Sequence, residues 1–204
     1  MGGKNPILVF DDADLDLAVR TALEGAFVQT GQRGIASSRL IVTDGIHDRF
    51  VAAPDQTMAG LTVGHALDPG TRIGSVADAS QLAANLGQIK KCWSKGELLV
   101  GCGKLSKRPT TGHYLSPALF TKAANWQAVA LEEIVGPIAC GIRVRDCDQG
   151  LATANKTNLS LRAGVCTAAR KHATHSRRKA GAGMVMVNLP TAGLRAQGIK
   201  LLPP

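Results

Sequence analysis

The sequence predicts an α/β domain whose mostly parallel, twisted sheet is covered by helices on both faces. Short apolar runs bounded by Gly, Pro or acidic residues recur along the 204 residues, and segments with apolar residues at helical spacing separate most of them. Several of these runs are continuous rather than alternating, which is typical of strands buried on both faces. Strands that alternate with helices of this length favour parallel pairing through crossover connections.

The amino-terminal part predicts two strands and two helices. "NPILVF" (5–10) suits a buried strand, and Asp11 and Asp12 can cap the helix that follows. That helix extends through about residue 32, and "SRLIVT" (38–43) is the second strand. "IHDRFVAA" (46–53) opens a helix that Pro54 should end or kink. The first helix carries an apolar stripe made of Leu15, Val19, Ala22, Leu23, Ala26 and Phe27.

The remaining residues continue the alternation after a Gly- and Pro-rich connection at 64–75. A helix over 77–96 precedes a strand at 97–102. Neither an internal repeat nor a linker-like segment is visible, so the pattern indicates one domain. Further strands are expected at 117–121, 137–144, 163–167 and 183–188, and further helices near 146–155 and 168–180.

Composition indicates a soluble, cytoplasmic protein with no membrane segment. Hydrophobic residues make up 45% and charged residues 19%, as in ordinary globular domains. No targeting signal is visible, and the longest charge-free run, Ala180–Leu194, has 15 residues and is interrupted by glycine and proline. The five cysteines form no C-x-x-C pair, so we expect reduced thiols rather than disulfides or a zinc site.

The net charge of +9 raises the possibility of nucleic-acid binding. Its densest part, "RKHATHSRRK" (170–179), is typical of a helix with a solvated basic face. Only seven aromatic residues are present, which disfavours a stacking platform and therefore specific nucleic-acid recognition. Non-specific polyanion binding at low salt stays open.

Spacing alone reveals no complete active site. The G-x-S-x-G, G-x-x-x-x-G-K-[ST] and G-x-G-x-x-G motifs are absent, and "GCGKLS" (101–106) has Ser106 where a third glycine belongs. His172 and His175 lie one helical turn apart and could ligate a metal ion, but no other ligand accompanies them in the sequence. We therefore expect a solvated helix and no metal site.

Five stretches, in order, resemble the catalytic domain of the aldehyde dehydrogenase superfamily. The last of them is most similar to semialdehyde dehydrogenases such as the alpha-ketoglutaric semialdehyde type. The stretches are "GGKNPILVFDDADLDLAV" (2–19), "TGQRGIASSRLIV" (30–42), "VGHALDPGTRIGSV" (63–76), "LEEIVGPIACGIRV" (131–144) and "AGMVMVNLPTAG" (182–193). The resemblance implies a catalytic domain over residues 1–193 and a divergent tail over 194–204.

The resemblance places Gly34 at the position of the nucleophile. In that family the residue after G-Q-x is a cysteine, whose thiolate attacks the aldehyde before hydride passes to the nicotinamide and water hydrolyses the thioester. Glycine has no side chain, so the covalent step cannot begin at residue 34. The resemblance thus implies that no catalytic residue is intact in this chain.

Other features of the resemblance agree with a loss of activity. The family's base glutamate and its dinucleotide-binding domain precede the stretch that begins here with Met1, so both are expected to be missing. Glu133 occupies the position that contacts the nicotinamide ribose and is a vestigial cofactor residue, while Val135 replaces a phenylalanine. NAD(P) is therefore implied by the family alone, and no tight cofactor binding is expected.

Three functions remain open: a silent aldehyde dehydrogenase fragment, a hydrolase with another nucleophile, and a basic binding module. Ser37 and Ser38 lie near Gly34, but neither has a recognisable histidine–acid partner. The resemblance also implies a homo-oligomer, with a dimer through the helix over about 13–32 favoured. A sheet edge near the tail offers a second route to association.

Overall fold

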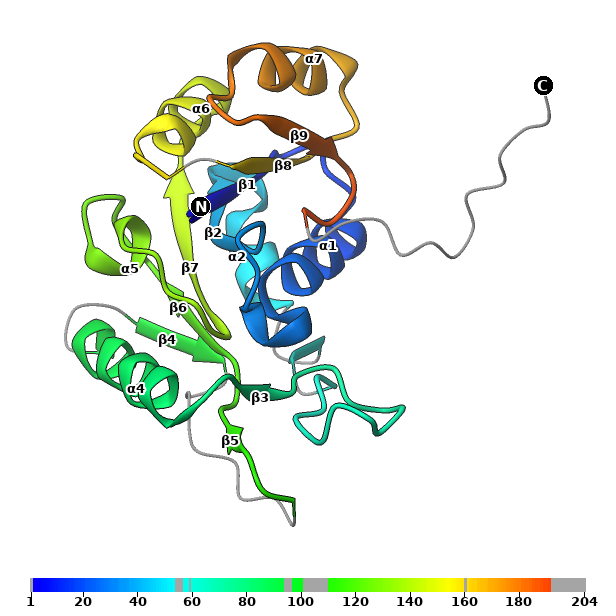
Figure 1. The fold of residues 1–204 in the computed structure, drawn as a ribbon. Helices are drawn as coiled ribbons and strands as arrows, with labels where there is room; N and C mark the ends of the chain where they lie inside the picture. Colours follow the sequence, from blue (N-terminus) through cyan, green and yellow to red (C-terminus); the bar gives the residue numbers. More distant parts are fainter. Residues whose placement is uncertain are drawn as a thin grey trace, which may run out of the picture.

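The computed structural model describes residues 2–53, 57, 58, 60–93, 97–100, 110–159 and 161–191. A seven-stranded sheet in the order β4-β6-β7-β2-β1-β8-β9 forms its centre, and all neighbouring pairs except β4–β6 are parallel (Figure 1). The mostly parallel sheet predicted from the sequence is confirmed. The strands are β1 (Asn5–Val9), β2 (Ser37–Thr43), β4 (Glu97–Val100), β6 (Ala118–Thr121), β7 (Ile138–Val144), β8 (Arg162–Cys166) and β9 (Met184–Val187), and a separate antiparallel pair joins β3 (Ser75–Val76) and β5 (His113–Tyr114).

Helices cover both faces of the sheet (Figure 1). α1 and α2 pack on one face, and α4, α5 and α6 pack on the other. None of the described helices is long and apolar enough to cross a bilayer. The helices are α1 (Leu15–Phe27), the 3₁₀ helix η1 (Val28–Gly31), α2 (Asp44–Ala52), α4 (Ala79–Trp93), α5 (Ala128–Leu131), α6 (Cys147–Asn155) and α7 (Arg170–Lys179).

Alternation along the central strands divides the core into two layers. In β1, Ile7 and Val9 face the α1–α2 layer, whereas Leu8 lies in the layer under α6. Both layers are almost wholly shielded from water, so the apolar residues of the central strands are buried on one side or the other. The continuous apolar runs in the sequence arise from this two-sided burial.

Most predicted elements are present, with shifted ends. α1 stops at Phe27 rather than near residue 32, and Asp14, not Asp11 or Asp12, caps it by accepting from the Leu17 N–H at 2.9 Å. α2 ends at Ala52, directly before the segment that contains Pro54, as predicted. The strand predicted at 97–102 is β4, whose last two expected residues lie outside the described part of the chain.

A buried arginine, Arg39, joins β2 to the end of α6. The Arg39 side chain is fully buried, and its Nε donates to the Lys4 carbonyl at 3.0 Å. Its two Nη atoms donate to the carbonyls of Thr153 and Ala154 at the end of α6, at 3.1 and 2.8 Å. Burial lowers the pKa of Arg39 to about 10. The guanidinium therefore binds carbonyls at the end of a helix, where the last turn leaves acceptor positions unused.

Candidate functional site

Three segments meet at the amino edge of the parallel strands. Residues 2–4 precede β1, residues 32–36 precede β2, and residues 133–136 precede β7. Because β1, β2 and β7 are parallel neighbours, their amino ends lie at one edge of the sheet. Gly34 and Glu133, which the sequence singled out, are therefore brought to the same region.

The buried Asn5 carboxamide fixes the backbone around Gly34. Its Nδ2 donates to the carbonyls of Gly34 and Ala36 at 2.8 and 3.0 Å. Its Oδ1 accepts the N–H groups of Leu161 and Arg162 at 3.3 and 2.8 Å. All four hydrogen-bonding positions of one side chain are thus used to hold the turn that contains Gly34 against the start of β8.

Gly3 and Glu133 lie beside this turn. The Gly3 N–H donates to Glu133 Oε1 at 3.0 Å, and a side chain on Gly3 would overlap the carbonyl oxygen of Gly34. Only glycine permits so close an approach of the two backbones. The three segments enclose a cavity of about 10 Å³ that Arg33 and Ser38 also line, which is room for about one water molecule.

The residues between α1 and β2 follow an unusual backbone path. Gln29, Thr30 and Gly31 have positive φ values of 57°, 62° and 63°. Thr30 Oγ1 accepts the Gly74 N–H at 3.0 Å, and Gln32 Oε1 accepts the Ala77 N–H at 2.9 Å. Two non-glycine residues in the left-handed region carry conformational strain, which these contacts offset. The segment is therefore held against residues 74–77.

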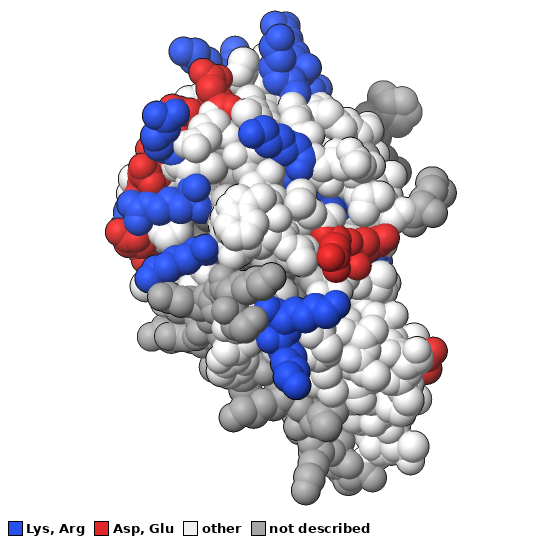
Figure 2. Space-filling model, turned by 90° about the vertical axis from the view of Figure 1, so that its left-hand side faces the viewer, with Lys and Arg blue, Asp and Glu red and all other residues white. Residues whose placement is uncertain are grey.

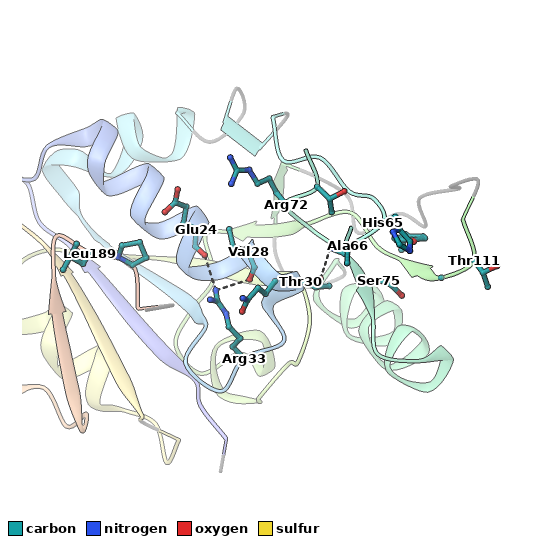
Figure 3. Close-up of a pocket in the computed structure, with 16 residues that line it drawn as sticks. Glu24, Val28, Thr30, Arg33, His65, Ala66, Arg72, Ser75, Thr111 and Leu189 are labelled. Carbon is teal, nitrogen blue, oxygen red and sulfur yellow. Dashed lines mark hydrogen bonds between the residues drawn. The ribbon is translucent and has the colours of Figure 1, made fainter. Parts of the chain in front are cut away.

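A larger cavity of about 840 Å³ opens next to this segment (Figure 3). Arg33 enters its wall, where Nη2 donates to the Val28 carbonyl at 3.1 Å and to the Glu24 carbonyl at 3.5 Å. Burial lowers the pKa of Arg33. His65 and Arg72 contribute further basic groups, so the cavity combines charged and apolar surface, as small-molecule sites do. Its other lining residues include Thr30, Ala66, Ser75, Thr111, Tyr114, Leu189 and Pro190.

Three of the cysteine side chains in the described part of the chain, Cys92, Cys140 and Cys166, are buried in the core, whereas Cys147 is half-buried. Cys140 and Cys166 are buried, and burial raises the pKa of their thiols to about 11 and about 12. Both therefore stay protonated at neutral pH, as their expected packing role requires. Cys92 is also buried, and Cys102 lies outside the described residues.

The two serines near Gly34 are not arranged as nucleophiles. The Ser37 hydroxyl is buried and lies 2.5 Å from the Thr191 hydroxyl. Ser38 is buried, and its hydroxyl has no hydrogen-bond partner within the described residues. No histidine is paired with either hydroxyl in this part of the structure, so the geometry gives the hydrolase alternative no support.

The two histidines of α7 have separate partners. His172 Nδ1 lies 3.5 Å from an Asp12 oxygen, and its ring packs 5.1 Å from that of Phe10. His175 Nε2 lies 3.3 Å from Asp148 Oδ1, and Cys147 is close to both. Two residues that can ligate a metal ion therefore lie beside His175 in space, although none accompanies it in the sequence. Sequence spacing could not reveal this, because packing of α6 against α7 creates the group.

Basic residues of the molecule do not form one uninterrupted surface on the face drawn in Figure 2. Lysine and arginine side chains are scattered there, and acidic side chains lie among several of them. In α7, Arg177, Arg178 and Lys179 lie in the last turn, where the negative end of the helix favours them, whereas Arg170 and Lys171 lie in the first turn. A solvated helix explains this charge without a polyanion.

Comparisons with known proteins agree on one family. A family model described as "Aldehyde dehydrogenase family" matches residues 1–200. The alpha-ketoglutaric semialdehyde dehydrogenase of Bacillus subtilis is 36% identical over 97% of this chain and 41% of its own length. The NADP(+) succinate-semialdehyde dehydrogenase of Deinococcus radiodurans is 34% identical over 94% of this chain and 40% of its own length.

Solved structures show the same likeness in three dimensions. The 1-pyrroline-5-carboxylate dehydrogenase from Thermus with bound NAD superposes with a TM-score of 0.90 at 32% identity, covering 95% of this chain and 37% of that one. HpcC from Thermus thermophilus gives a TM-score of 0.88 at 35% identity over 96% and 38%. The chain thus spans about two fifths of the length of the curated relatives above.

Replacing Asn5 tests how the turn at Gly34 is held. Asn5→Ala leaves two carbonyls and two N–H groups without their partner, and each buried orphan costs about 1–3 kcal/mol unless water enters. We expect the free energy of unfolding, measured with urea, to fall by about 2–4 kcal/mol. Asn155→Ala is the matched control, because its bonds to Lys179 and Gly181 are exposed and water can replace them. Equal losses in the two variants would contradict the role given to Asn5.

Proposed function

Because the chain belongs to the aldehyde dehydrogenase family, we propose that it is a catalytic domain of that fold in which Gly34 stands at the nucleophile position, so that it oxidises no aldehyde itself. The proposal includes the assignment of residues 1–193 to this domain and of 194–204 to a divergent tail. The observation that carries it is the glycine at residue 34, in a segment that otherwise resembles the family's nucleophile segment.

The chemistry requires a thiolate at this position. A thiohemiacetal forms when a thiolate adds to the aldehyde carbon, and only then can hydride leave toward a nicotinamide. Gly31 is the one glycine with a positive φ in the described part of the chain, so the backbone at Gly34 does not demand glycine. Loss of the thiol therefore changes the chemistry more than it changes the fold.

The described cysteines offer no replacement. Cys140 lies inside β7, and its Sγ donates to the carbonyls of Ser38 and Val129 at 3.6 Å. Cys166 is the last residue of β8 and is almost fully buried. Cys147 follows β7 and so lies at the carboxyl edge of the sheet, whereas Gly34 precedes β2 at the amino edge. A thiol at the opposite edge cannot act on a substrate held beside Gly34.

Glu133 is the residue that we assign to a contact with a dinucleotide cofactor. Its carboxylate is exposed and is engaged by the Gly3 N–H. In our proposal it corresponds to the family's ribose contact, which supports NAD(P) as the ancestral cofactor. One hydrogen-bonding group supplies too little energy to overcome the entropy lost on binding, so we expect no tight complex through Glu133 alone.

We also propose that the chain forms a homodimer. The predicted stripe of α1 is mostly used by the core, and the outer side of that helix carries Asp16, Arg20 and Glu24. Strand β9 pairs only with β8 within the described residues, and its sequence is Met-Val-Met-Val. A partly exposed apolar edge strand favours association with a second copy. The β9 edge therefore supports a dimer better than the predicted helix does.

Aldehyde oxidation tests the proposed loss of activity. The purified chain should give no reduced cofactor with NAD or NADP and a panel of aldehydes that includes alpha-ketoglutaric and succinic semialdehydes. Absorbance of the reduced nicotinamide is the measurement, and the Bacillus subtilis relative is the positive control. Turnover that scales with protein concentration and exceeds the blank without protein would refute the proposal.

Light scattering behind a sizing column tests the dimer. The +9 charge opposes close approach of two copies, so the dimer fraction should rise with salt until screening is complete. Met186→Lys places a charge on the partly exposed β9 strand and should shift the equilibrium toward monomer, while Arg20→Lys on α1 should not. A monomer at both low and high salt would overturn this part of the proposal.

A further inference from the structure

A thiol, a carboxylate and an imidazole converge at the carboxyl edge of the sheet. Cys147 is the first residue of α6, Asp148 is the second, and His175 comes from the middle of α7. One ligand atom from each residue lies within 4.8 Å of the other two. Figure 1 shows α6 and α7 next to each other at this end of the molecule, where the two helices are in contact.

The geometry of this group suits a tetrahedral metal ion. Zinc binds sulfur at about 2.3 Å and imidazole nitrogen or carboxylate oxygen at about 2.0–2.2 Å, which places the nitrogen and oxygen about 3.4 Å apart in a tetrahedron. His175 Nε2 and Asp148 Oδ1 lie 3.3 Å apart. The Asp148 side chain is 90% exposed, so it is free to adjust, and a water molecule can complete the coordination.

The electrostatic surroundings of Cys147 favour a cation. Asp146 caps α6 and Asp148 lies in its first turn, so the two carboxylates flank Cys147 in the sequence. They place negative charge near the sulfur in a molecule whose net charge is +9. A divalent cation is attracted by this charge, and zinc displaces the proton of a cysteine side chain that it binds.

We propose that Cys147, Asp148 and His175 form a binding site for a thiophilic divalent metal ion of the zinc class. The site joins α6 to α7 and lies at the edge opposite Gly34, so it is independent of the proposed loss of aldehyde oxidation. Thiolate and imidazole ligands select zinc, cobalt and related ions over magnesium and calcium, which prefer oxygen ligands.

Cobalt provides a direct readout of sulfur ligation. The reduced chain, freed of metal by a chelator, is titrated with Co²⁺ and then with Zn²⁺. We expect one Co²⁺ per chain, with a thiolate-to-cobalt charge-transfer band in the near ultraviolet that Zn²⁺ abolishes. Zinc at about 100 times its Kd should raise Tm by roughly 5–10 °C, because it binds the folded chain.

Matched variants identify the ligands. Cys147→Ser should abolish the charge-transfer band. His175→Gln removes a ligand and should weaken Zn²⁺ binding by at least about 10–100-fold, which is the cost of losing a group that only supports a ligand. His172→Gln is the control, because it removes the other histidine of α7, which faces Asp12. Cys102→Ser is a second control for the thiol outside the described residues. Both controls should bind as the unaltered chain does.

Peptide mapping keeps the test decisive if a variant fails to fold. In the unaltered chain, Zn²⁺ should slow the alkylation of Cys147 at least tenfold, whereas Mg²⁺ should leave it unchanged. The proposal is overturned if the band is absent, if it persists in Cys147→Ser, if His172→Gln weakens binding as much as His175→Gln, or if zinc does not protect Cys147.

Discussion

The amino edge of the sheet depends on the four hydrogen bonds of one buried carboxamide. Asn5 joins the turn at Gly34 and Ala36 to the first residues of β8, and no other uncharged side chain except glutamine can both donate and accept twice. Because Asn5 is the first residue of β1, strand pairing fixes the position of its backbone. The Arg39 side chain, which comes from β2, binds both the segment before β1 and the end of α6. The scaffold around residue 34 is therefore held by side chains that bind backbone groups.

In our proposal, this anchoring through backbone groups explains how the family scaffold can persist with glycine at the nucleophile position. Asn5, Arg39 and the close approach of Gly3 to Gly34 all act on backbone atoms, so they place no demand on the side chain at residue 34. Glu133 likewise holds the Gly3 N–H whether or not a dinucleotide is present. Selection for folding alone would retain these residues, whereas a thiol is retained only by selection for catalysis.

The sequence predicted the elements that repeat a simple period and missed those that depend on tertiary contacts. β1, β2 and β7 are buried on both faces, so they could be predicted from continuous apolar runs in the sequence. Pro54 predicted the end of α2. The left-handed residues Gln29 and Thr30, which end α1 early, carry no local signal because neither is glycine. The two-residue strands β3 and β5 are too short for a pattern. Family resemblance, not spacing, singled out Gly34 and Glu133, and the convergence of Cys147 with His175 required the packed helices.

Acylation of the segment around residue 34 tests the central claim most directly, because it requires a nucleophile but no cofactor. The unaltered chain and Gly34→Cys are treated with an activated ester such as p-nitrophenyl acetate, and the peptides are mapped by mass spectrometry. The account predicts no acyl group on residues 30–39 of the unaltered chain, and in Gly34→Cys an acyl group at position 34 that forms faster than any on Cys140 or Cys166. Acylation of Ser37 or Ser38 in the unaltered chain, or an unreactive thiol at position 34, would contradict it.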